Sequence, residues 1–111
     1  MQPSDRFRFR HMVDAARDAM AFVQGRSRAD LDKDRQFTLS VVKCIEIIGE
    51  AATKISSEAK EEVPSVPWPD VIGMRHRLIH MYYDVNLDIV WKTATVELPR
   101  LVEALEEALA E

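Results

Sequence analysis

The sequence from residue 35 to residue 55 reads RQFTLSVVKCIEIIGEAATKI, and its apolar residues recur at intervals of three and four. This spacing predicts an amphipathic helix that begins between residues 32 and 35 and ends near residue 55. The apolar stripe is wide, because Val42 and Ile47 flank a row formed by Phe37, Val41, Cys44, Ile45, Ile48, Ala51, Ala52 and Ile55. A stripe of this width indicates a central helix that contacts several neighbouring elements.

The segment before this helix has the same spacing. Residues 5–24 predict an amphipathic helix, with Ser4 or Asp5 able to cap its N-terminus and Gly25 able to end it. Residues 25–34 are polar and predict a loop. Residues 56–69 are polar and contain prolines, so they predict a second connection, with a short helical turn near residues 58–62.

Two more helices are expected toward the C-terminus. Pro67 and Pro69 suit the first turn of a helix that continues through the stretch GMRHRLIHMYYD at residues 73–84. The stretch DVNLD at residues 84–88 predicts a break that caps a last helix, which runs to about residue 109. Pro99 is expected to kink this helix or divide it in two.

Composition and periodicity together indicate the fold class. The chain has 111 residues, of which 47% are hydrophobic and 31% charged, which is typical of one compact domain spanning residues 1–111 and not of a disordered chain. No segment alternates between apolar and polar residues with β-branched enrichment. We therefore expect an all-α fold, an antiparallel bundle of four or five helices.

The charge balance and the cysteine content limit the classes of function. The net charge is −4, so a polyanion would have to bind a local basic patch. Arg6, Arg8 and Arg10 alternate and cannot share one helical face, so they do not predict such a patch together. Cys44 is the sole cysteine and lies in an apolar run, which fits a reducing cytoplasm. No run of about 18 apolar residues and no signal-peptide core is present, so neither membrane insertion nor export is expected.

Residues 73–84 contain two arginines, two histidines and two tyrosines. His76 and His80 are four residues apart and would lie about 40° from each other on a helix, as metal ligands often do. In the zinc-protease pattern a glutamate follows the first histidine, whereas here Arg77 follows it. An arginine would repel a cation and cannot act as a general base. No metal is expected at this pair.

Arg75 and His80 are five residues apart, so on a straight helix they would diverge by about 140°. They converge on one substrate only if the helix deforms or a second copy of the chain completes the site. Arginine with histidine suits RNA cleavage without metal, because an imidazole can take the proton of a ribose 2′-OH while a guanidinium holds the phosphate charge. In the alternative interpretation, the arginines are solvated helix charges and His80 is a packed, hydrogen-bonded histidine.

The whole segment resembles the HepT-like toxins of the HEPN superfamily. Their signature is matched by Arg75, four residues, His80, one residue and Tyr82. The resemblance extends to the stretches IEIIGEAATKIS (45–56), VPWPDVIGMRHRLIHMYYDVNLDIVW (66–91) and ELPRLVEALE (97–106), which follow the family order. It covers about the last two thirds of the chain and is more specific than an isolated arginine-to-histidine spacing.

The resemblance implies an all-α homodimer whose two motifs face each other in a basic cleft and act as a metal-independent endoribonuclease that needs no cofactor. Arg75 and His80 would be the catalytic pair. His76 occupies a position that is typically polar in the family and would orient a partner or contact the RNA. Arg77 is not part of the signature, and we expect it to assist RNA binding or to be solvated. Glu50, on the helix expected to lie behind the site, would pair with a motif arginine or histidine, or be a solvated charge.

The resemblance also implies a partner, a minimal nucleotidyltransferase antitoxin that would transfer AMP from ATP to Tyr82, as in type VII toxin–antitoxin systems. The added phosphate would lie beside Arg75 and His80 and block the cleft. Tyr83 is either a second acceptor or a half-buried packing ring. The alternative function is a non-catalytic HEPN-like module that binds nucleotides or RNA, or regulates a partnered nucleotidyltransferase.

Overall fold

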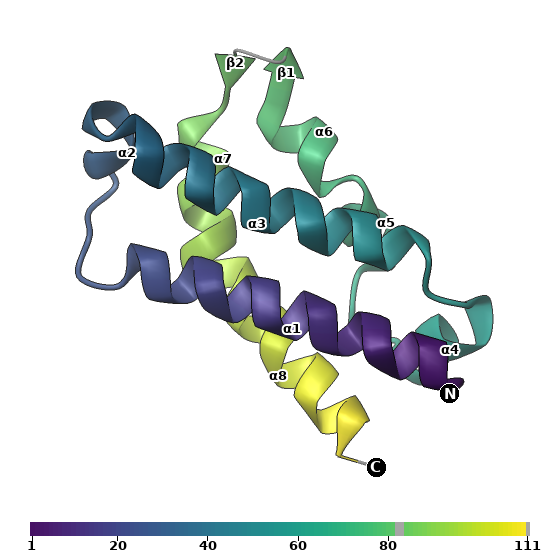
Figure 1. The fold of residues 1–111 in the computed structure, drawn as a ribbon. Coiled ribbons are helices and arrows are strands. Elements are labelled where there is room, and N and C mark those ends of the chain that lie inside the picture. Colours follow the sequence, from purple (N-terminus) through teal and green to yellow (C-terminus); the bar gives the residue numbers. More distant parts are fainter. Residues whose placement is uncertain (82–83, 111) are drawn as a thin grey trace.

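The computed structural model describes residues 1–81 and 84–110, and for residues 80 and 81 it describes the backbone alone. Two long helices, α1 (Pro3–Val23) and α3 (Arg35–Thr53), lie side by side and run in opposite directions (Figure 1). The C-terminal helix α8 (Leu98–Leu109) packs across α1. The prediction of an all-α fold is confirmed, and no helix in the described part of the chain is long and apolar enough to cross a bilayer.

The core lies where these three helices meet. Its largest fully buried apolar side chains come from each of them, and include Phe9, Met12, Val41, Ile45, Ile48, Leu98 and Leu105. Burial of one such side chain stabilises the fold by roughly 1.5–3 kcal/mol. The stripe predicted for residues 35–55 is confirmed at Val42, which is buried, and α3 contacts both α1 and shorter helices. The prediction is wrong for Ile47, which is 39% exposed.

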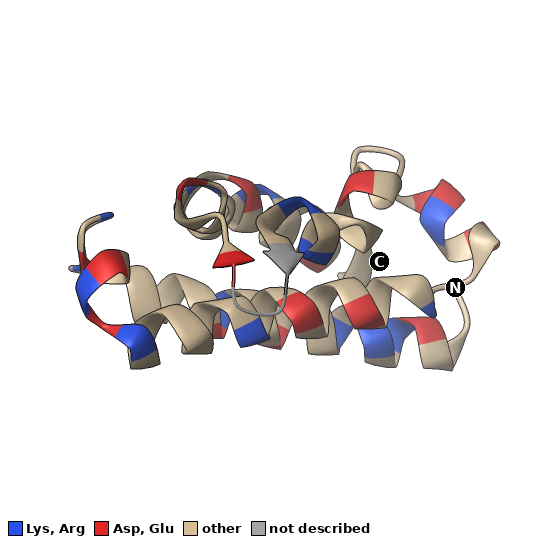
Figure 2. Ribbon diagram, turned by 90° about the horizontal axis from the view of Figure 1, so that it is seen from above, with Lys and Arg blue, Asp and Glu red and all other residues tan. Residues whose placement is uncertain are grey.

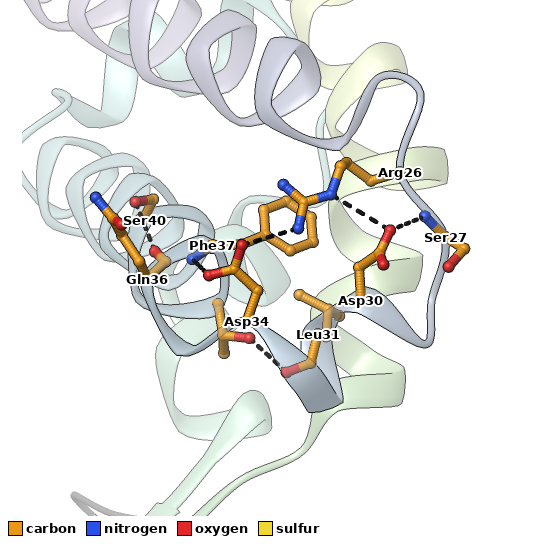
Figure 3. Close-up of polar contacts among 9 residues, drawn as sticks. Arg26, Ser27, Asp30, Leu31, Asp34, Gln36, Phe37 and Ser40 are labelled. Carbon is orange, nitrogen blue, oxygen red and sulfur yellow. Dashed lines mark hydrogen bonds and ion pairs between the residues drawn. The ribbon is translucent and has the colours of Figure 1, made fainter.

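The connection between α1 and α3 is held by charges around Arg26. Gly25 ends α1 with a positive φ of 75°, and the short helix α2 (Asp30–Lys33) follows. The Arg26 guanidinium lies 4.0 Å from the centre of the Phe37 ring, and its Nη2 donates to Asp34 Oδ2 at 3.0 Å (Figure 3). Asp34 also accepts from the Phe37 amide at 3.0 Å and thereby caps α3, so the predicted start near residues 32–35 is confirmed.

The N-terminus of α1 differs from the prediction, because its N-cap is Gln2 and neither Ser4 nor Asp5. The helix begins at Pro3, and Asp5 is buried inside the first turn. Its carboxylate accepts hydrogen bonds from the backbone amide of Ser56 at 2.9 Å and from the Ser56 hydroxyl at 2.8 Å. Burial alone would raise the pKa of Asp5, but these hydrogen bonds and one from the Gln2 amide hold it below its ordinary value. Asp5 therefore joins the start of α1 to the start of α4 (Ser57–Glu62).

The predicted third helix is wrong in its extent. Two short helices, α5 (Trp68–Ile72) and α6 (Met74–Leu78), are followed by strand β1 (Ile79–Met81), which pairs with strand β2 (Asp84–Val85) in an antiparallel ribbon. The amide of Asn86 donates to the carbonyl of Leu78 at 2.6 Å, where α6 ends. Strands this short show no alternation in the sequence, so the pairing of β1 with β2 ends the helix without a local signal.

The last helix is divided, as Pro99 predicted. Asn86 accepts from the Ile89 amide at 3.1 Å and caps α7 (Leu87–Lys92), which confirms the break at residues 84–88. A π-helical segment, η1 (Thr93–Glu97), then leads into α8, with Pro99 in the first turn of α8. Proline has no amide hydrogen to donate to the preceding turn, so the widened segment lies where regular hydrogen bonding is interrupted.

Candidate functional site

Helix α6 presents its cationic residues because two apolar residues anchor it. Met74 and Leu78 are one turn apart and buried, and α6 packs against α3. Arg75, His76 and Arg77 lie between these anchors and are exposed. The sequence MRHRL therefore places three cationic or titratable groups on the outer side of one helical turn.

Arg75 faces helix α3. Its Nε lies 3.9 Å from Oε1 of Glu46, and the side chains are 50% and 33% exposed, respectively. The guanidinium is thus oriented by a carboxylate but keeps solvent-facing donors for a phosphate. Glu50 was the expected partner of a motif arginine or histidine, whereas the partner of Arg75 is Glu46, one turn earlier on the same face of α3.

Arg77 pairs with a different element. Its Nη2 lies 3.6 Å from Oε1 of Glu97 in η1, and Oε2 of the same carboxylate accepts from the Thr93 hydroxyl at 3.0 Å. The two motif arginines are therefore tied to opposite parts of the fold, Arg75 to α3 and Arg77 to η1. The catalytic role of Arg75 stays a prediction. Arg77 was expected to assist RNA binding or to be solvated; it is 40% exposed and contacts Glu97, and its part in RNA binding also stays a prediction.

His80 lies in strand β1, two residues after the end of α6. The 140° divergence expected for a straight helix does not apply, because the backbone becomes extended at Ile79, with φ −117° and ψ 109°. The His80 side chain, and Tyr82 and Tyr83 entirely, lie outside the described residues. The roles of His80 as catalytic histidine and of Tyr82 as AMP acceptor therefore stay predictions. The same holds for Tyr83 as second acceptor or packing ring, and for His76 as a residue that orients a partner or contacts the RNA.

An open groove of about 550 Å³ begins beside Arg75 and runs between α1 and α3. Its lining contains Phe7, Arg8, His11, Lys43, Glu46, Ile47, Glu50, Ala51, Lys54 and Arg75. Glu50 is in this lining, and its carboxylate lies 3.7 Å from Nζ of Lys54. The prediction that Glu50 pairs with an arginine or histidine of the motif stays a prediction. The part of α1 in lining this groove was not predicted, because α1 and α3 meet through long-range contacts that local sequence spacing does not reveal.

The groove differs in charge from the rest of the molecule. Figure 2 shows Lys and Arg interspersed with Asp and Glu along the helices, and the chain as a whole is acidic. The groove lining holds the four cations Arg8, Lys43, Lys54 and Arg75 against the two carboxylates Glu46 and Glu50. It is therefore a local basic patch of the kind that a polyanion requires on an acidic protein.

Two other kinds of chemistry receive no support here. The Cys44 thiol is buried, and burial raises its pKa, which disfavours the reactive thiolate. Among the side chains that the structure describes, no three His, Cys, Asp or Glu residues cluster as metal ligands do. The site that remains is an arginine at the edge of a basic groove, followed closely along the chain by a histidine.

Comparison with known proteins identifies the family. The family model described as ribonuclease HepT-like matches residues 12–108. A protein of Caldanaerobacter subterraneus subsp. tengcongensis, provisionally named an RNase, is 37% identical over 99 residues, which are 89% of this chain and 88% of that protein. A similarly named protein of Methanocaldococcus jannaschii is 33% identical over 92 residues, which are 83% and 76% of the two chains.

A protein of Thermococcus cleftensis that carries the provisional name ribonuclease HepT is 38% identical over 76 residues, which are 68% of this chain and 67% of that protein. No solved structure gives a significant match. The match of the family model extends from within α1 to the last turn of α8, and it includes α6 and the groove-forming part of α3. By this extent of similarity, the chain belongs to the HepT-like ribonuclease family.

Proposed function

We propose that this chain is an endoribonuclease that cleaves RNA without a metal ion. The observation that carries the proposal is the position of Arg75, half exposed at a basic groove and oriented by Glu46, on a helical turn that ends two residues before His80. Membership of the family and the RNase names of the relatives support the same activity.

In the proposed reaction the imidazole of His80 takes the proton from a ribose 2′-OH. The resulting oxygen attacks the adjacent phosphorus, and the guanidinium of Arg75 holds the charge that develops on the phosphoryl oxygens. The bond from phosphorus to the 5′ oxygen breaks, and a second acid protonates that oxygen. The products are a 2′,3′-cyclic phosphate and a 5′-hydroxyl end, and DNA is not cut because it lacks the nucleophile.

A second copy of the chain supplies the second acid in this proposal. A twofold dimer would bring two arginines and two histidines to one cleft, so that one imidazole acts as base and the other as acid. Each chain supplies one signature pair, Arg75 and His80, so a second such pair can come only from a partner copy. Sedimentation of the purified protein tests the dimer, and a monomeric mass at activity-assay concentration would contradict it.

The cleavage reaction is tested with a labelled single-stranded RNA in buffer that contains EDTA. The wild type is expected to cleave, and the Arg75→Ala/His80→Ala double variant is expected to lose at least about 100-fold in rate. Arg100→Ala, which removes an exposed arginine of α8, is the matched control and should cleave normally. No cleavage by the wild type, or equal cleavage by the double variant, would refute the enzyme.

We also propose that the enzyme is the toxin of a toxin–antitoxin pair and is silenced by a nucleotidyltransferase that transfers AMP to Tyr82. An AMP group adds a phosphate that competes for Arg75 and a nucleotide that fills the cleft. Mass spectrometry after coexpression with a neighbouring nucleotidyltransferase should show the addition of AMP. Tyr82→Phe should abolish it and Tyr83→Phe should not; the reverse pattern would move the acceptor to Tyr83.

The second candidate is a non-catalytic module that binds RNA or nucleotides, or regulates a partnered nucleotidyltransferase. One observation favours it: both motif arginines are paired with carboxylates, Arg75 with Glu46 and Arg77 with Glu97, as charges with a structural role are. The EDTA experiment separates the two functions, because a binding module retains RNA without producing a cyclic phosphate end.

A further inference from the structure

Two aromatic rings stand side by side in the groove. Phe7 and His11 are one turn apart on α1, their ring centres are 4.3 Å apart, and the ring planes are tilted by 49°. Phe7 is 56% exposed, the largest exposed fraction among the exposed large apolar side chains of the described residues. A ring held open to solvent within a groove offers a stacking surface to a planar ligand.

The cations around these rings are not all neutralised. Arg75 pairs with Glu46 and Lys54 pairs with Glu50, which uses both carboxylates of the groove. Arg8 from α1 and Lys43 from α3 also line the groove, and no carboxylate of the described residues lies within ion-pair distance of either one. The excess positive charge of the groove is thus carried by one residue from each wall.

We propose that this groove is a subsite for a single-stranded nucleotide adjacent to the phosphate held by Arg75. A base stacks on the Phe7 and His11 rings, and Arg8 and Lys43 contact the flanking phosphates. This inference rests on the proposed ribonuclease function. The groove volume of about 550 Å³ falls within the range of small-ligand sites. Stacking together with a cationic track accepts many sequences but requires unpaired bases, so the subsite selects single-stranded RNA.

A second copy of this chain is the other occupant to consider, because Phe7 and Ile47 are exposed apolar side chains in the groove. A twofold contact centred on the groove would place the same surface against itself. Cations outnumber carboxylates four to two on this surface, so two copies of it would carry the same net charge and repel each other. An anionic strand instead complements the charge and continues directly to Arg75, so the observations favour RNA.

The decisive variant is Phe7→Leu, because leucine keeps an apolar contact with another protein but has no ring for a base. The probe is a short 2′-O-methyl RNA, which cannot be cleaved, with one 2-aminopurine whose fluorescence falls on stacking. Phe22→Leu is the matched control, since Phe22 is also exposed on α1 but lines a different groove. Phe7→Trp keeps a ring at the same place. The molar mass of each variant in solution is also measured by light scattering. Cleavage of RNA with ordinary 2′-hydroxyl groups is measured in parallel.

We expect Phe7→Leu to weaken probe binding by about 5- to 100-fold and to remove the fluorescence quenching. Phe22→Leu and Phe7→Trp should bind as the wild type does, and all should have the same mass. Wild-type binding and quenching by Phe7→Leu would overturn the subsite while leaving the ribonuclease intact. A changed mass in Phe7→Leu with unchanged RNA affinity would assign the groove to a contact between copies. If the wild type neither binds the probe nor cleaves RNA, the proposed function fails and the subsite with it.

Discussion

The Arg75 guanidinium and the Glu46 carboxylate face each other where α6 packs on α3, with Nε and Oε1 3.9 Å apart. Both groups are partly solvated, so the pair contributes little to stability. The Glu46 carboxylate instead has two effects on Arg75. It orients the guanidinium, and it competes with any phosphate that approaches the guanidinium. The pair therefore links the candidate catalytic group to α3, which lines the groove.

Glu46→Gln should tighten the binding of a non-cleavable single-stranded RNA by a few-fold at low salt, because it removes a competing negative charge beside Arg75. The gain should shrink as salt rises. The free energy of unfolding should change by less than about 1 kcal/mol. Glu50→Gln, in the same groove but paired with Lys54, serves as comparison. Weaker RNA binding by Glu46→Gln would show that the carboxylate's orienting effect outweighs its competition.

Replacement of Arg8 and of Arg77 should have different effects on RNA affinity and on its salt dependence. Arg8 lies near Arg75 in space, and Arg77 is near it along the chain. Arg8 lines the groove, whereas Arg77 pairs with Glu97 of η1. Arg8→Gln should lower RNA affinity and reduce the magnitude of the slope of log affinity against log salt by about 0.7, the value for one phosphate contact with a single strand. Arg77→Gln should leave that slope unchanged. Equal slopes for the two variants, measured by salt titration, would contradict the assignment.

Leu78 anchors the end of α6 and is fully buried. Leu78→Ala should lower the free energy of unfolding by about 2–5 kcal/mol, because it removes buried methyl groups and leaves a cavity beside the motif. Leu39→Ala, at a leucine that is 50% exposed on α3, should cost less than about 0.5 kcal/mol. Urea unfolding followed by circular dichroism measures both, and similar losses for the two variants would mean that α6 is not anchored through Leu78.

Asp5 predicts a specific response to acid. Because its pKa in the folded chain lies below the ordinary value of 3.8, its stabilising contribution is complete above that pH and is lost as the pH falls through the folded-state pKa. Asp5→Asn should cost about 1–3 kcal/mol at neutral pH, where the hydrogen bonds to Ser56 are weakened. The variant should also lose less stability than the wild type when the pH is lowered below about 4.

The control for this measurement is Asp14→Asn, which changes an exposed carboxylate on the same helix. Its acid dependence should follow that of the wild type. Parallel pH profiles for the wild type and Asp5→Asn would show that the buried carboxylate does not contribute to acid unfolding.

The sequence by itself determined the two long helices, although it misplaced the N-cap of α1. The spacing of apolar residues predicted α1 and α3, because a helix that buries one face needs that period whatever its neighbours are. Gly25 marked a stop, the stretch at residues 84–88 marked a cap, and Pro99 marked a division, for reasons that are local to the backbone. The motif residues were visible for the same reason, since their order along the chain is itself the signal.

The tertiary structure alone decided where those residues lie. Helix α6 ends at Leu78 because its carbonyl accepts from the amide of Asn86, a contact across eight residues of chain that no helical period encodes. Arg75 meets Glu46 and not Glu50 because the packing of α6 on α3 sets which turn it faces. Phe7 and Arg8 join Lys43 in one groove only through the pairing of α1 with α3. Local spacing specifies a helix, whereas contacts between distant segments specify the site, because only the folded chain brings them within reach.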